Sequence, residues 1–86
     1  MKQIIVSFKN RNNLYAFVRL IRNSGVAVSI INTPHSISVS CGLSARLDFR
    51  YFSLIKTLLI QYGTADLIGV FLVERLNGYD RTERLL

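Results

Sequence analysis

Cys41 carries the most reactive side chain in this sequence. It is the one cysteine among 86 residues, and His35 is the one histidine. A single cysteine cannot form an internal disulfide, and one cysteine with one histidine is too small a set for a zinc or iron–sulfur site. We therefore expect a free thiol, with no metal site and no bound cofactor.

A free cysteine reacts as its thiolate, which is the nucleophilic form of the side chain. Such a thiolate must be reachable and stabilised by positive charge. Gly42 would let a partner approach the backbone, while Arg46, Arg50 and the start of the following helix are candidate stabilising groups.

The alternation around Cys41 supports a different interpretation. Apolar residues occupy the odd positions from Ile37 to Leu47, whereas Ser, Gly and Arg occupy the even positions from 36 to 46. This pattern predicts a strand with one buried face and one small, polar face in water. Cys41 would then be an inert core residue, and only a bulge at Gly42 would turn its thiol outward.

Conventional enzyme chemistry is not expected. His35 follows Pro34 in a turn, where an exposed histidine is more common than a base acting on Cys41. The five acidic residues are scattered and show no catalytic pairing.

The charge and hydropathy of the chain limit its partners. The net charge is +6, which would permit an acidic partner. Residues 36–41, in the third predicted strand, lack the aromatic residues on which RNA-recognition motifs stack bases, so nucleic acid is not an expected partner. No apolar run reaches the roughly 18 residues of a spanning helix, and no signal sequence opens the chain. We expect a soluble, cytoplasmic protein.

Hydrophobic periodicity predicts an α+β fold. Strands are expected over residues 3–8, 26–31, 36–47 and 66–76. A first helix carries the stripe Leu14 to Ile21, with Asn12 or Asn13 as its cap and Gly25 at its end; a second runs from the cap Asp48 to Gly63. The order is the ferredoxin-like βαββαβ pattern, with a four-stranded antiparallel sheet, its first and last strands in the centre, and both helices on one face.

One domain is expected over residues 1–76, followed by a polar, basic tail over 77–86 that frays. The two most apolar strands have hydrophobic residues on both faces. Ile5, Phe71 and Val73 are therefore predicted to be covered by a homodimer or another partner. A non-catalytic binding or regulatory module acting through this open face, with a structural Cys41, is the alternative function.

The residues on either side of Cys41 resemble a known family. The Asn32-Thr33-Pro34 turn, followed by Ser40-Cys41-Gly42-Leu43 within this order of elements, is similar to the small bacterial domains described as selenium/sulfur carrier-like. The resemblance covers about residues 3 to 75. It implies that Cys41 and Gly42 form the motif, with Pro34 and Ser40 as its flanks. It also implies a carrier role, in which the Cys41 thiolate accepts a sulfane sulfur, or its selenium analogue, from a persulfide and surrenders it by a second exchange. The partners would then be a protein donor and a protein acceptor of sulfur or selenium.

Overall fold

The computed structural model describes residues 2–34, 37 and 42–86, and their fold is α+β with two α-helices and one antiparallel sheet. The elements follow one another as β1 (Lys2–Phe8), α1 (Arg11–Asn23), β2 (Ser29–Asn32), β3 (Leu43–Asp48), a 3-10 turn η1 (Phe49–Tyr51), α2 (Phe52–Tyr62), β4 (Leu67–Leu76) and β5 (Tyr79–Arg84).

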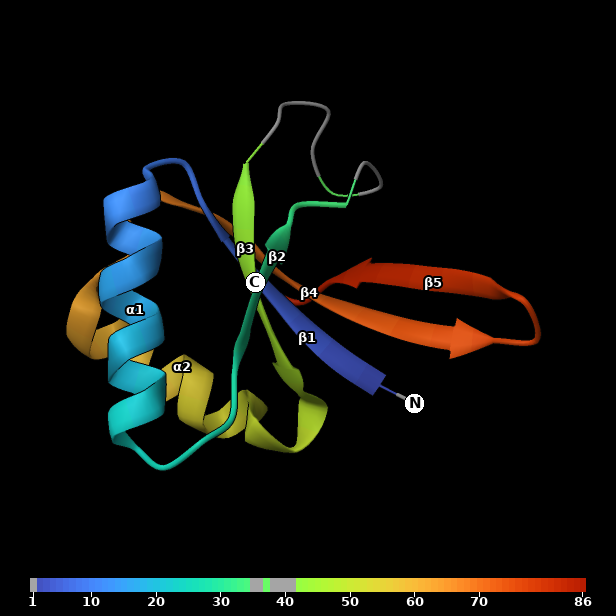
Figure 1. The fold of residues 1–86 in the computed structure, drawn as a ribbon, viewed down its shortest axis with the longest axis horizontal. Helices are drawn as coiled ribbons and strands as arrows, with labels where there is room; N and C mark the ends of the chain where they lie inside the picture. Colours follow the sequence, from blue (N-terminus) through green and yellow to red (C-terminus); the bar gives the residue numbers. More distant parts are fainter. Residues whose placement is uncertain (1, 35–36, 38–41) are drawn as a thin grey trace.

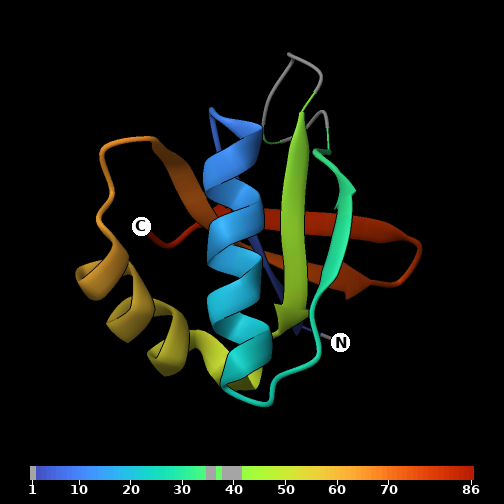
Figure 2. The ribbon, with the colours of Figure 1, turned by 60° about the vertical axis from the view of Figure 1, so that its left-hand side comes forward.

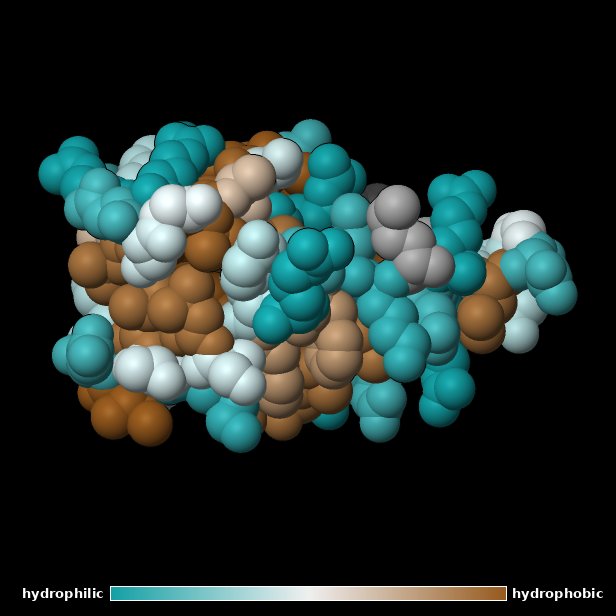
Figure 3. Space-filling view, turned by 90° about the horizontal axis from the view of Figure 1, so that it is seen from below, coloured by the Kyte–Doolittle hydropathy of each residue, from teal (hydrophilic) through white to brown (hydrophobic). Residues whose placement is uncertain are grey.

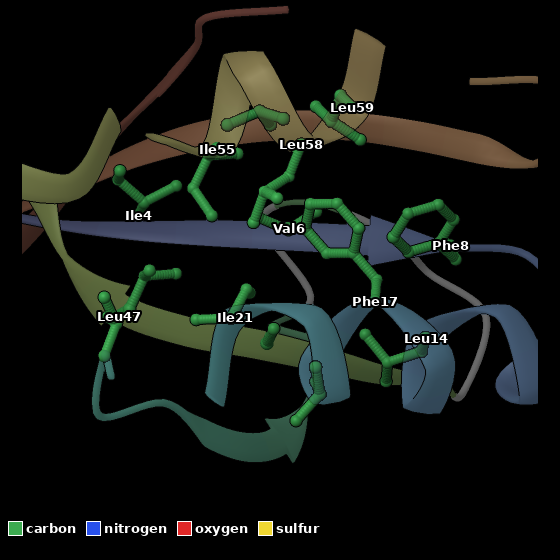
Figure 4. Packing of buried hydrophobic residues seen from close by; sticks show 14 residues of the cluster. Ile4, Val6, Phe8, Leu14, Phe17, Ile21, Leu47, Ile55, Leu58 and Leu59 are labelled. Carbon is green, nitrogen blue, oxygen red and sulfur yellow. The ribbon is translucent and has the colours of Figure 1, made fainter. Parts of the chain in front are cut away.

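The sheet has the strand order β2-β3-β1-β4-β5, and every neighbouring pair is antiparallel. Both helices lie on the same side of it, and the β4–β5 hairpin projects away from them (Figures 1 and 2). The core fills the space between helices and sheet. It joins Ile4 and Val6 of β1 to Phe17 of α1 and Ile55 of α2 (Figure 4).

Helix α1 buries the predicted stripe Leu14, Phe17, Val18 and Ile21. Its cap, however, is Asn10 and not Asn12 or Asn13, because the Asn10 side chain accepts a hydrogen bond from the Asn12 backbone N–H at 2.8 Å. Asp48 caps η1, which leads into α2, by accepting from the Arg50 N–H.

The prediction of four strands is wrong, because the C-terminal tail forms a fifth. In the β4–β5 hairpin, residue pairs run from Leu76 with Tyr79, next to the turn, to Phe71 with Arg84. The connecting residues are Asn77 and Gly78, and Gly78 has a φ of 91°, which glycine adopts without strain. The end of the chain also donates from the Leu85 N–H to the Val70 carbonyl at 2.7 Å, so the tail does not fray.

The third strand begins later than predicted. Ile37 lies in a turn, where its N–H donates to the Pro34 carbonyl at 3.0 Å. Strand β3 starts at Leu43, opposite Asn32, which is the last residue of β2. Strand β2 ends before the Thr33-Pro34 turn, so on that side Leu43 is the first residue of β3 with a strand partner. The predicted strand residues 38–41 lie outside the described part of the chain.

Candidate functional site

The segment from Thr33 to Gly42 is closed at its base by a backbone hydrogen bond. The Thr33 N–H donates to the Gly42 carbonyl at 2.8 Å, and Gly42 is exposed. A Cβ at position 42 would lie 3.6 Å from Thr33 Oγ1, an ordinary contact. The predicted site residue Cys41, its flank Ser40 and His35 lie outside the described residues. The candidate site is therefore defined by the two ends of this segment.

A chain of three hydroxyl groups lies beneath that base. Ser44 Oγ is 2.6 Å from Ser7 Oγ on β1 and 2.6 Å from Thr33 Oγ1. Ser7 and Ser44 are fully buried. The chain joins β1, β3 and the residue that pairs with Gly42, so it anchors the segment that holds Cys41 to the sheet.

The burial of Ser44 corrects the expected exposure of the polar face of β3. Ser44 pairs with Ser7 on one side and with Ile31 on the other, because β3 is flanked by two strands. Its hydroxyl bonds to neighbouring hydroxyls instead of water. The three residues are far apart in sequence and each is small, so no local pattern identifies them as a group.

Arg46 lies on the open face of the sheet, which is the face turned away from the helices. It is exposed, and it pairs with Ile5 in β1 and Ser29 in β2. Counting along β3, Arg46 is separated from Gly42 by three residues, so their Cα atoms are about 13 Å apart.

Arg50 lies at the other end of β3 from Gly42. Its Nε is 3.4 Å from Asp48 Oδ1, and both side chains are well exposed. The Arg50 backbone N–H and, more weakly, its charge hold the pKa of Asp48 below its usual value. The six-residue strand spans about 20 Å. The structure therefore brings neither Arg50 nor the start of the second helix to the Gly42 end.

Much of the apolar surface on the open face is buried by residues of the same chain. Ile5 is 2% exposed and Phe71 is 6% exposed. The Arg84 guanidinium lies over the Phe71 ring, 5.8 Å from its centroid, and its terminal nitrogen donates to the Ile68 carbonyl at 2.9 Å. The argument that Ile5 and Phe71 require a partner is therefore wrong, because both are buried within the chain, whereas Val73 is partly exposed. A homodimer stays a prediction.

Two further features limit what the described residues could hold. No group of three or more His, Cys, Asp or Glu residues among them is placed to bind a metal ion. Within the same residues, neither helix has the length and apolar character needed to cross a membrane.

Polar side chains predominate over the β4–β5 end of the molecule, and hydrophobic surface gathers at the helical end (Figure 3).

Comparison with known proteins bears on the segment around Gly42. No curated protein sequence matches the chain significantly. A family model matches residues 3–66, which include β1 from Gln3 onward, both helices and the whole Thr33–Gly42 segment. The match covers well over half of the sequence and confirms the resemblance to this family. The chain belongs to the family described as "Putative Se/S carrier protein-like".

Proposed function

We propose that this protein is a sulfur or selenium carrier in which Cys41 holds the transferred atom. The observation that carries the proposal is the family match across the segment that contains Cys41. The late start of β3 supports it, since the objection to an exposed thiol was the alternation of a strand through Cys41. With β3 beginning at Leu43, that alternation does not extend to Gly42.

The transfer requires no external oxidant or reductant. The Cys41 thiolate attacks the outer sulfur of a donor persulfide, RSSH. A bond forms between Cys41 Sγ and that sulfur, the S–S bond of the donor breaks, and the donor leaves as its thiolate RS⁻. A second thiolate, on the acceptor, then attacks the carried sulfur and releases Cys41. The partners are a protein donor and a protein acceptor, and the protein acts as a carrier and not as a conventional enzyme. A reducing cytoplasm, where thiols stay free, suits this chemistry.

The fold is proposed to be a ferredoxin-like domain with one added strand. The order β2-β3-β1-β4, with a helix after β1 and another after β3, fits the split βαβ pattern. Strand β5 then extends the sheet at the free edge of β4.

The test is the mass of the intact protein after incubation with glutathione persulfide. We expect the folded protein to gain the mass of one sulfur atom and to lose it on treatment with dithiothreitol. Cys41→Ser should gain nothing, because Cys41 is the one cysteine in the sequence. If the folded protein gains no sulfur while the urea-unfolded protein does, Cys41 is a buried structural residue and the carrier function is wrong.

A further inference from the structure

A pocket of about 540 Å³ lies on the open face of the sheet. Its apolar lining comes from Ile5 in β1, Ile31 in β2 and Val73 in β4. Pro34, at the start of the segment that holds Cys41, lines it as well. Small-molecule sites typically enclose about 300–1,000 Å³ with mostly apolar walls and a few polar groups, so the pocket has the size of such a site.

Two arginines line the pocket from opposite sides of β1. Arg46 lies on β3 and Arg75 on β4, and β1 runs between these strands. Arg46 is level with Phe71, since both pair with Ile5. Arg75 therefore lies about 10 Å away across the sheet and about 13 Å along it, which is close enough for two long side chains to border one ligand.

Arg46 pairs with the uncharged residues Ile5 and Ser29, whereas Arg75 pairs in register with Asp80 of β5. In the part of the chain that the structure describes, the ion pair found is that of Arg50 with Asp48. Arg46 and Arg75 are both exposed. A guanidinium group presents several N–H donors in a planar fork that matches a carboxylate. Gln3, between them on β1, adds an amide to the same lining.

We propose that this pocket binds a small organic acid. Its carboxylate accepts hydrogen bonds from both Arg46 and Arg75, and its apolar part lies against Val73, which is partly exposed. The proposal goes beyond the carrier function and does not depend on Cys41. It assigns a role to the open face that the family description does not mention.

Benzoate tests the proposal, because it combines a carboxylate with a small apolar body. Titration of the isotopically labelled full chain, followed by NMR, should move the backbone amides of Ile5 and Val73 with a dissociation constant in the millimolar range. Benzamide has the same shape without the charge and should bind at least about tenfold more weakly. Equal binding of benzoate and benzamide to the unmodified protein would overturn the proposal. Chemical-shift changes at amides away from the pocket would overturn it as well.

Charge-matched variants provide the second arm of the test. Arg46→Gln and Arg75→Gln should each weaken benzoate binding by about tenfold, the loss expected for a charge-assisted hydrogen bond. Arg19→Gln removes the same charge from an exposed position on α1 and should change binding by less than about twofold. If Arg19→Gln weakens binding as much as the pocket variants do, the protein attracts benzoate only through its net charge and the pocket assignment fails.

Discussion

Ser44 is the described residue on which the base of the Cys41 segment most depends. It bonds to Ser7 and to Thr33, both at 2.6 Å, and it is fully buried. Ser44→Ala would leave a buried hydroxyl on Ser7 without its partner. A buried polar group that loses its hydrogen bond costs about 1–3 kcal/mol. We expect the free energy of unfolding, measured in urea, to fall by that amount.

The control for Ser44→Ala is Ser29→Ala, which removes an exposed hydroxyl from β2. This change should alter the free energy of unfolding by less than about 0.5 kcal/mol. A Ser7→Ala/Ser44→Ala double variant should lose less stability than the sum of the two single variants, because neither hydroxyl is then left unpartnered. Strict additivity would show that the chain of hydroxyls does not act as a unit.

The two arginines first assigned to the thiolate are not equivalent. Arg46 lies on the same strand as Gly42 and nearer to it, whereas Arg50 is beyond the far end of β3 and beside Asp48. At physiological ionic strength the Debye length is about 8 Å, so an exposed charge some 20 Å away is largely screened. We expect Arg50→Gln to leave the rate of Cys41 alkylation by iodoacetamide unchanged. Arg46→Gln should slow it more than Arg50→Gln does, and the reverse order would contradict this geometry.

At the scale of single residues, the sequence singles out Cys41 as a candidate but not the hydroxyl groups of Ser7, Thr33 and Ser44. A lone cysteine next to glycine can be recognised from residue type. The Ser7–Ser44–Thr33 contacts depend on the register between strands. This register brings the Oγ atoms of Ser7 and Ser44, 37 positions apart in the sequence, to 2.6 Å from each other. The small polar residues of an alternating strand look solvent-exposed unless the partners across the sheet are known.

At the N-terminus of helix α1, the negative charge comes from a residue that is distant in the sequence. Its first turn contains no acidic residue. Asp66, just before β4, instead accepts hydrogen bonds from the Asn10 N–H at 2.6 Å and from Asn13 Nδ2 at 3.0 Å. These bonds, that of the Asn13 side chain first, lower the pKa of Asp66. A carboxylate near the N-terminus of a helix also interacts favourably with the helix dipole.

Asp66→Asn should therefore change how stability depends on acid. Because the pKa of Asp66 is lower in the folded state than its unfolded value of about 3.9, its stabilising effect is fully present above that value. The effect is lost as the pH falls through the lower, folded pKa. We expect wild type to unfold at higher urea concentration than Asp66→Asn at pH 7, and the difference to disappear in strong acid.

The comparison for Asp66→Asn is Glu83→Gln, which removes one negative charge from an exposed position on β5, far from α1 in the sequence. Its effect at pH 7 should be smaller than that of Asp66→Asn. A stability difference for Asp66→Asn that stays constant from pH 7 to strong acid would show that the carboxylate charge is not what stabilises the helix end.

Both helices and four of the strands could be predicted because their signals are local. Apolar stripes at helical spacing mark α1 and α2, and Gly63 ends α2 with a φ of 102°. The start of β3 could not be predicted, since it is set by where β2 ends. Strand β5 lacks apolar alternation, yet the Asn77-Gly78 pair before it is a hairpin signal that could have revealed it.

For the whole molecule, the tail completes the open face. The Arg84 guanidinium covers the Phe71 ring, and Leu85 packs against the core and bonds to Val70. The family match ends at residue 66, before β4 and β5. Strand β1, within the matched region, pairs with β4, and β4 in turn depends on the tail for its cover; both β4 and the tail lie outside that region.

Truncation after Leu76 tests this dependence. Removing residues 77–86 would expose Phe71 and break the β4–β5 ladder and the Leu85 N–H bond to Val70. Exposing one aromatic side chain and losing several hydrogen bonds should lower the free energy of unfolding by about 2–4 kcal/mol. Urea unfolding, followed by circular dichroism, measures the change. Arg84→Gln, which keeps the strand but removes the cation over Phe71, should cost less than the truncation. If the truncated chain unfolds at the same urea concentration as the full chain, β5 is an appendage and strands β1 to β4 suffice for the sheet.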